Sequence, residues 1–270
     1  MKSSKNIISI GGVGGSGTRL IAQILEESGY FTGYDLNESN DTLLFTLLFK
    51  QQKILTITNN ELNETLNIFI KIMSSPEPLS QKELSALSIL ASTNRTLHDK
   101  EWLQGRVEFV HERKLHDNWG WKEPNTHIVI ERLLKKMNNL KFVYVYRNGL
   151  DMAYSDNQNQ LKLWGPIFLN DYNLEINPKN SLKYWCITHK RMLKLKNIFQ
   201  DRIFMLDFDK LCNNPEDILL DLSKFIGYKK DILKFQTLIK APSSIGRYKE
   251  HSLDNFDKED LDFLHDIYNV

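Results

Sequence analysis

Three short apolar runs stand out in the hydrophobic pattern of the chain, each rich in β-branched or aromatic residues. They cover residues 7–10, 141–146 and 202–206, and we predict a buried strand for each. A fourth strand is expected at 30–32, because the next strand of a βα unit follows soon after its helix ends. The pattern predicts a sheet made of short strands that lie far apart in the sequence.

Between these runs, apolar residues recur every three or four positions, as in amphipathic helices. We predict helices over residues 18–28, 128–137, 180–199, 214–226 and 257–268. Thr126 is the expected N-cap of the second helix, and Gly227 ends the fourth. From about residue 39 to 103 the pattern is helical throughout, with Ser80 and Glu83 spaced as a capping box. This stretch is predicted to be a helical insertion.

Strands that alternate with helices indicate an open α/β fold. We expect a P-loop-like parallel sheet with helices on both faces and the helical insertion at about 39–103. Neither an internal repeat nor a linker interrupts the pattern. We therefore expect a single domain that spans residues 1–270.

Composition and charge narrow the possible partners. The 270 residues include 35 Lys and Arg and 34 Asp and Glu, a net charge of +1, so we expect no nucleic-acid or membrane partner. Two cysteines, Cys186 and Cys212, argue against a disulfide framework and a Cys-rich zinc site. The first residues contain no apolar leader and no apolar stretch is long enough to span a bilayer. We expect a cytoplasmic protein.

A glycine-rich segment, Gly11–Gly17, lies between the first predicted strand and the first helix. Backbone N–H groups in such a turn and the following helix N-terminus form an anion site. In an ATP-binding Walker A loop the last glycine precedes a Lys and a Ser or Thr, whereas here Thr18 and Arg19 follow. We therefore expect a phosphate-binding loop that is not that of an ATPase or kinase.

The same segment also fits the fingerprint of NAD-binding Rossmann proteins. Gly12, Gly14 and Gly17 have the required spacing, and Asp35 stands near the place of a ribose-binding carboxylate. An NAD-dependent oxidoreductase is thus an alternative. The long helical insertion weakens it, because a Rossmann half would continue through a short crossover to its third strand.

A second motif follows the strand predicted at 141–146. Arg147 stands at the carboxyl end of that strand and Ser155 lies eight residues later. A guanidinium and a hydroxyl placed in this way put two donors on one anion beside the glycine loop. Asp151, midway between them, is a candidate for orienting the arginine.

Together the two motifs resemble those of the sulfotransferase superfamily that uses 3′-phosphoadenosine 5′-phosphosulfate (PAPS) as donor and releases 3′-phosphoadenosine 5′-phosphate (PAP). The style of the motifs is similar to the bacterial, tyrosylprotein and heparan-type branches. The resemblance implies that Arg147 and Ser155 hold the 3′-phosphate. The residues implied as contacts of the 5′-phosphosulfate are Gly14, Gly15, Ser16, Gly17, Thr18 and Arg19.

Three further segments resemble the family in the same order. Lys122, in Trp-Lys-Glu-Pro, matches a lysine that points at the sulfuryl group, and Phe208 matches an aromatic residue that lies against the adenine. The late segment Ser243–Lys249 resembles one that closes over the nucleotide. It makes Arg247, Tyr248 and Lys249 candidate nucleotide contacts. Residues 39–120 are unmatched, and we expect them to wall the acceptor pocket.

Sulfuryl transfer needs charge stabilisation and a base but no metal. In the family a Lys or Arg commonly stands where this chain has Gly15, which leaves Lys122, together with Arg19, to stabilise the charge. A protein that binds nucleotide with weak turnover is therefore a further alternative. The candidate bases are Asp35, Asp41 and then Glu38, with His111, His116 and His127 behind them. The expected partner is an acceptor hydroxyl of a carbohydrate, small molecule or peptide, whose identity the sequence leaves open.

Overall fold

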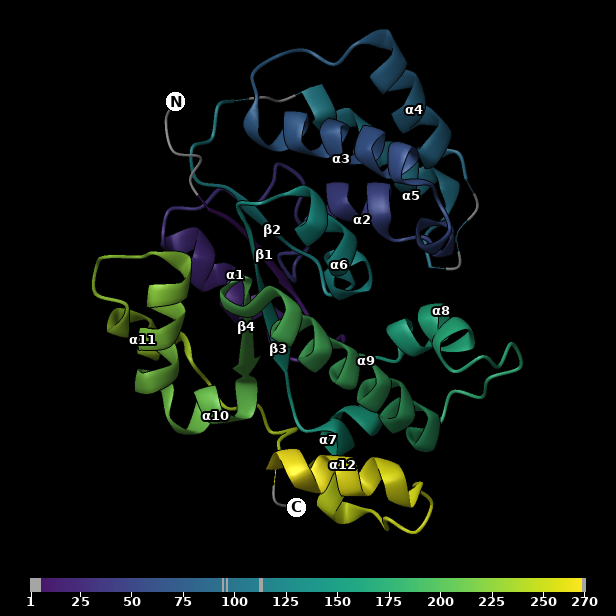
Figure 1. Ribbon diagram of the computed structural model, residues 1–270, viewed down its shortest axis with the longest axis vertical. Coiled ribbons are helices and arrows are strands. Elements are labelled where there is room, and N and C mark those ends of the chain that lie inside the picture. Colours follow the sequence, from purple (N-terminus) through teal and green to yellow (C-terminus); the bar gives the residue numbers. More distant parts are fainter. Residues whose placement is uncertain (1–5, 94, 96, 112–113, 269–270) are drawn as a thin grey trace. The chain divides into compact units, whose positions relative to one another are not determined.

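The computed structural model describes residues 6–93, 95, 97–111 and 114–268 (Figure 1). Its backbone contacts group into two compact units. The first unit comprises the chain up to Ile10 and Ile21–Lys141, and the second comprises Gly11–Leu20 and the chain from Phe142 onwards. The single domain expected from the sequence stays a prediction, and the units are described one at a time.

Four parallel strands form the sheet: β1 (Ile7–Gly11), β2 (Gly120–Lys122), β3 (Leu140–Tyr146) and β4 (Ile203–Asp207), in the order β2-β1-β3-β4. Three of them follow the apolar runs of the sequence, and their buried side chains form the core. The predicted α/β class, with a parallel sheet flanked by helices, is confirmed.

The prediction of a strand at residues 30–32 is wrong. Phe31 makes only an isolated parallel bridge with Trp119, and the next strand along the chain is β2, which pairs with β1 from Ile8↔Gly120 to Ile10↔Lys122. A Cβ on Gly120 would lie 2.0 Å from the Ile8 carbonyl oxygen. The strand pair therefore needs a glycine at this position, and a three-residue strand leaves little hydrophobic signal in the sequence.

The first unit holds the helical insertion, drawn in blue in Figure 1. Its helices are α2 (Leu43–Phe49), α3 (Asn59–Ser74), α4 (Gln81–Ala91) and α5 (Lys100–Val107), with 3₁₀ turns η1 (Gln52–Leu55) and η2 (Glu108–His111). The predicted capping box of Ser80 and Glu83 is confirmed at the start of α4. Every residue of α2 is buried, and Phe69 of α3 meets Trp121 edge-on at 5.2 Å.

Two further helices complete this part of the chain: α1 (Thr18–Glu27), which follows the glycine loop, and α6 (Thr126–Lys136). Thr126 was predicted as the N-cap of α6 but is its first helical residue, with Asn125 as N-cap. The Thr126 hydroxyl does not cap the helix and accepts a hydrogen bond from the Trp121 indole (3.1 Å).

The described residues of the second unit from Phe142 onwards form the helices α7 (Gly149–Ala153), α8 (Asn159–Phe168), α9 (Pro178–Phe199), α10 (Phe208–Asn213), α11 (Pro215–Ile226) and α12 (Lys258–Tyr268). Its 3₁₀ turns are η3 (Gln200–Arg202), η4 (Leu233–Leu238) and η5 (Arg247–Glu250). The predicted ends of α11 are confirmed, with Pro215 in its first turn and Gly227 left-handed at its C-cap. A helix was expected directly after the strand that ends at Tyr146, and α7 is that helix, although it ends before Ser155. The short helices α8 and α10 were not predicted.

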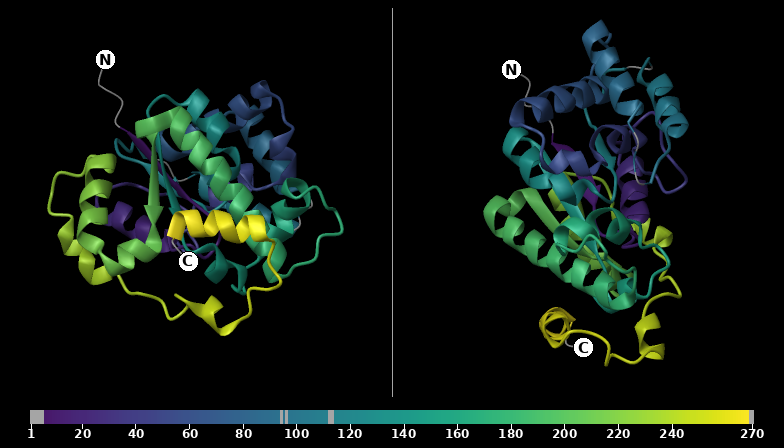
Figure 2. Two further views of the ribbon diagram at one scale, coloured as in Figure 1. Left: turned by 60° about the horizontal axis from the view of Figure 1, so that its bottom comes forward. Right: turned by 90° about the vertical axis from the view of Figure 1, so that its right-hand side faces the viewer.

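A shared apolar cluster holds α7, α9 and α12 together in the second unit. It includes Leu150, Trp185 and Leu264, one from each helix, and Figures 1 and 2 show α12 lying beside α9. The segment that joins α11 to α12 carries η5 and also packs on this cluster through Tyr248. Among the described residues, no helix is long and apolar enough to cross a membrane.

Candidate active site

The glycine loop is part of the second unit and is fixed by close backbone approaches. A Cβ on Gly12 would lie 2.1 Å from the carbonyl oxygen of Val145, so only glycine fits between the loop and β3. The Gly12 carbonyl accepts a hydrogen bond from the Gln160 side chain (2.9 Å). Gly15 and Gly17 have φ of +91° and +92°, which L-residues with side chains rarely adopt. The conformation of the predicted loop therefore requires glycine at these positions.

Ser16 and Thr18 lie at the end of the glycine loop and the start of α1. Ser16 is fully buried, yet its hydroxyl has no hydrogen-bond partner among the described residues. Thr18 begins α1 and is 4% exposed. A buried hydroxyl without a partner costs free energy, and an anion in the loop would remove that cost.

Arg147 follows β3 at its carboxyl end and is 4% exposed. One terminal nitrogen, Nη1, donates to the Ser244 hydroxyl (3.2 Å) and to the Gly15 carbonyl (3.5 Å). The guanidinium lies 5.7 Å from the centre of the Phe208 ring. The other terminal nitrogen, Nη2, is buried and has no partner among the described residues, so Arg147 retains an unused donor beside the loop.

The carboxylate that orients Arg147 is Asp209, and the prediction that Asp151 does so is wrong. The Arg147 Nε lies 3.4 Å from Asp209 Oδ1, and Asp209 Oδ2 accepts from the backbone N–H of Asn148 (2.8 Å). Asp151 lies in α7 and accepts instead from the backbone of residues 246–248. Sequence reasoning missed Asp209, although it directly follows Phe208 in a segment already matched.

Phe208 packs on the glycine loop. Its ring is buried, and a Cβ on Gly17 would lie 2.2 Å from its Cδ2. Ser155 lies just beyond α7, with its hydroxyl 3.7 Å from the point that a Cβ on Gly15 would occupy. A Cβ on Gly14 would lie 3.3 Å from the side-chain amide nitrogen of Asn157. The second unit thus brings the loop, Phe208 and Ser155 together.

The late basic segment lies in the same unit. Arg247 donates through Nη1 to the Tyr154 carbonyl (3.2 Å) and through Nε to the Ser244 carbonyl (3.3 Å). Tyr248 packs against the apolar cluster of α7, α9 and α12, and Lys249 is exposed. Arg19 is exposed on α1. Every predicted nucleotide contact therefore belongs to the second unit, which includes the first turn of α1.

The predicted catalytic residues belong to the first unit. Lys122 ends β2 and is 2% exposed. Its ammonium pairs with the Asp41 carboxylate and donates to the Ser39 carbonyl (2.9 Å). The backbone N–H of Lys122 donates to the Thr42 hydroxyl (3.1 Å). Lys122 and Asp41 are therefore brought together as an ion pair at the end of a strand.

Asp35 is held by a different cation. The Arg106 Nη1 from α5 lies 3.1 Å from the Asp35 carboxylate. Burial raises the pKa of Asp35, and the Arg106 charge opposes that rise. Glu38 is exposed. Of the histidine alternatives, His127 is buried in α6, His116 stacks on Phe31, and His111 ends η2.

Glu123 is a buried carboxylate beside Lys122 that sequence reasoning did not single out. It follows Lys122, is 1% exposed and lies 3.4 Å from the Lys50 ammonium. It also accepts from the backbone N–H (2.6 Å) and the side-chain amide (2.8 Å) of Asn125. Burial raises its pKa, and Lys50 opposes the rise. The only sequence signal is its place between Lys122 and a proline.

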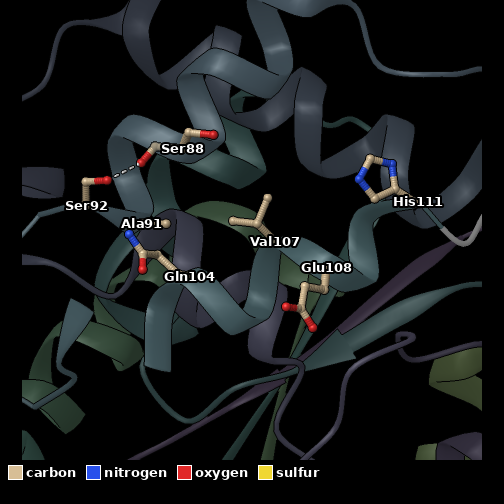
Figure 3. Close-up of a pocket in the computed structure, with 7 residues that line it drawn as sticks. All are labelled: Ser88, Ala91, Ser92, Gln104, Val107, Glu108 and His111. Carbon is tan, nitrogen blue, oxygen red and sulfur yellow. Dashed lines mark hydrogen bonds between the residues drawn. The ribbon is translucent and has the colours of Figure 1, made fainter. Parts of the chain in front are cut away.

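The insertion contains a pocket of its own. Figure 3 shows it between α4 and the stretch formed by α5 and η2, with a volume of about 430 Å³. Its lining residues are Ser88, Ala91, Ser92, Gln104, Val107, Glu108 and His111. That the insertion walls the acceptor pocket stays a prediction. Within the described residues, no three His, Cys, Asp or Glu side chains gather as a metal site, and the metal-free reaction also stays a prediction.

The parallel sheet and the glycine loop before α1 define a P-loop-like α/β protein. A family model described as "Sulfotransferase family" matches residues 8–231. The chain therefore belongs to the sulfotransferase family, and the resemblance seen in its motifs is confirmed. Membership of this family leaves the NAD-dependent oxidoreductase without support.

Two solved structures are similar in fold. The sulfotransferase domain of the olefin synthase from Synechococcus PCC 7002 has a TM-score of 0.50 and 13% identity, covering 100% of this chain and 97% of that one. The sulfotransferase domain from the curacin biosynthetic pathway has a TM-score of 0.50 and 12% identity, covering 98% of both chains. At these identities the similarity shows the fold alone. No curated protein matches the sequence.

Proposed function

We propose that this chain transfers the sulfuryl group of PAPS to the hydroxyl of an acceptor. One observation carries the proposal. Beside the glycine loop of the second unit, two buried donors, Ser16 Oγ and Arg147 Nη2, have no hydrogen-bond partner among the described residues. Buried polar groups are nearly always satisfied, so the pair favours an anionic ligand. Membership of the sulfotransferase family supports a phosphosulfate donor.

The residues of the second unit suit such a donor. Backbone N–H groups of Gly15 to Thr18 and the N-terminus of α1 suit the 5′-phosphosulfate. Arg147 and Ser155 suit the 3′-phosphate. The late segment would add two cations near the nucleotide, Arg247 and Lys249, with Tyr248 between them in the sequence. Phe208 is the proposed neighbour of the adenine. Its ring already covers Gly17, so the base would lie near the loop.

The residues of the first unit suit the transfer step. The acceptor oxygen forms a bond to sulfur while the bond from sulfur to the 5′-phosphate oxygen breaks. Lys122 Nζ stabilises the negative charge on the leaving oxygen, and a carboxylate takes the proton of the acceptor hydroxyl. The candidates are Asp35 and then Asp41, which forms an ion pair with Lys122. Arg19, which belongs to the second unit, can add positive charge, since Gly15 supplies none.

Calorimetry with PAP tests donor binding. Arg147→Gln removes a buried donor, and we expect it to weaken PAP binding by about tenfold to a hundredfold, because a charged hydrogen bond contributes roughly 1.5–3 kcal/mol. Arg202→Gln is the matched control. Arg202 immediately precedes β4, at the amino ends of β3 and β4. Arg147 lies at the carboxyl end of β3. No PAP binding by the wild-type chain, or equal effects of both variants, would contradict the proposal.

A turnover assay separates an enzyme from a protein that only binds nucleotide. Wild-type chain is incubated with PAPS and, in turn, a sugar, a phenol, a lipid alcohol and a tyrosyl peptide, and PAP release is followed. We expect release that depends on one class of acceptor. Tight PAP binding without release for any acceptor would favour the nucleotide-binding alternative, which Gly15 motivates.

A further inference from the structure

A buried carboxylate in α7 holds the backbone on both sides of Arg247. Asp151 is 2% exposed. Its Oδ2 accepts from the N–H of Gly246 (2.8 Å) and its Oδ1 from the N–H of Tyr248 (3.2 Å). No lysine or arginine of the described residues forms an ion pair with it, so the two N–H groups are the donors that satisfy this charge. Such hydrogen bonds are stronger than neutral ones.

The segment also contacts the rest of the unit through Tyr248, Ser244 and Arg247, and Asp151 adds acceptors for two of its backbone N–H groups. Gly246 is left-handed, with φ of +80°, and begins the four-residue turn η5 without a local side-chain cap. Lys249 N–H closes the turn on the Gly246 carbonyl (3.0 Å). Asp151 thus acts as a cap supplied by a distant element, because it satisfies N–H groups at the start of the turn that the turn itself leaves open.

Arg147 and Arg247 both form hydrogen bonds between the ends of α7 and the held segment. Asp151 lies four residues after Arg147, whose Nη1 donates to Ser244 in the held segment. The Arg247 guanidinium donates to the carbonyl of Tyr154, which follows α7. Gly149 keeps α7 against α9, since a Cβ there would lie 2.8 Å from the Trp185 ring. Packed against α9, α7 therefore contacts the segment that carries Arg247 through Asp151.

We propose that Asp151 is a positioning residue: it preorders residues 244–249 over α7, so that Arg247 meets the 3′-phosphate side of the donor without first paying for ordering of the segment. The inference rests on the proposed PAP and PAPS binding. Its structural half, that Asp151 orders the segment, concerns the chain without any ligand. Preorganisation of this kind raises affinity by removing an entropic cost of binding.

Hydrogen exchange tests the structural half. In the wild-type chain, the amides of Gly246 and Tyr248 are expected to be protected without ligand. Asp151→Asn keeps the size of the side chain but turns one acceptor into a donor, and exchange over 244–249 should rise by at least about tenfold. Asp221→Asn, an exposed change on α11, is the matched control. Unprotected amides in the wild type would overturn the inference even if Asp151→Asn failed to fold.

A double-mutant cycle tests the action through Arg247. PAP affinity is measured for the wild type, Asp151→Asn, Arg247→Gln and the double variant. We expect Asp151→Asn to weaken binding by about tenfold in the wild-type background and by less than about twofold when Arg247 is already replaced. Equal losses in both backgrounds would overturn the inference. Absence of PAP binding by the wild type would overturn the proposed function instead, while exchange would still decide the structural half.

Discussion

At the scale of single residues, the glycine loop is specified by steric contacts as well as by backbone freedom. Gly12 faces the Val145 carbonyl and Gly17 faces the Phe208 ring, each at a distance that no Cβ could occupy. Gly15 is exposed and has no such contact within 3.4 Å. The loop therefore has close contacts at Gly12 and Gly17, and it is exposed at Gly15 between them.

Gly17→Ala tests this steric requirement. The alanine Cβ would lie 2.2 Å from Phe208 at a φ of +92°, so the loop must shift. We expect a loss of roughly 1–3 kcal/mol of unfolding free energy and at least tenfold weaker PAP binding. Gly105→Ala in α5 has nothing within 4 Å and should stabilise by about 0.5–1 kcal/mol. Urea unfolding and calorimetry measure both, and unchanged PAP affinity of Gly17→Ala would contradict the steric argument.

At the scale of elements, α9 buries a histidine in its core face. His189 is 2% exposed, stacks on Trp185 at 4.8 Å and meets the Tyr146 ring at 4.6 Å. Its Nδ1 has no hydrogen-bond partner among the described residues. Burial lowers the pKa of His189 from 6.5 to about 4. The neutral form is thus the one that α9 accommodates.

The lowered pKa makes stability depend on pH. The unfolded chain binds a proton at His189 below about pH 6.5, whereas the folded chain does so only near pH 4, so stability is lost as the pH falls between these values. From pH 7 to pH 5.5 the loss from this group should be roughly 1 kcal/mol. We expect His189→Leu to reduce the pH dependence of urea unfolding by about this amount. An equal dependence in both proteins would contradict the assignment.

The elements also show what the sequence can predict. Strands β1, β3 and β4 and helices such as α9 and α11 were predicted because apolar runs and caps determine them locally. Strand β2 was missed because three residues carry no periodicity and its pairing depends on Gly120 fitting against Ile8.

The same limit applies to the candidate site. The glycine loop and Arg147 were predictable because their positions follow from a strand end and a turn. The ion-pair partners of the charged side chains could not be predicted. Asp209 rather than Asp151 orients Arg147, and Glu123 pairs with Lys50 across distant sequence. A carboxylate's partner depends on where helices such as α7 and α10 direct it, which spacing in the sequence does not encode.

At the scale of the whole molecule, the two groups of proposed site residues belong to different compact units. The second unit carries the proposed donor contacts, including Arg147, Ser155 and Arg247. The first unit carries Lys122, Asp41 and Asp35. A substitution in one group should therefore change one step of the reaction and spare the other, because donor affinity and charge stabilisation at the leaving oxygen depend on different side chains.

Lys122→Met tests this division. We expect PAP affinity to stay within about threefold of the wild type, while PAP release from PAPS with a competent acceptor falls by roughly a hundredfold to a thousandfold, because the charge on the leaving oxygen loses its stabilising cation. Lys135→Met, an exposed change on α6, is the matched control and should alter neither quantity. If Lys122→Met weakens PAP binding as much as Arg147→Gln does, Lys122 contributes to ground-state donor binding. The separation of roles between the two units would then be contradicted.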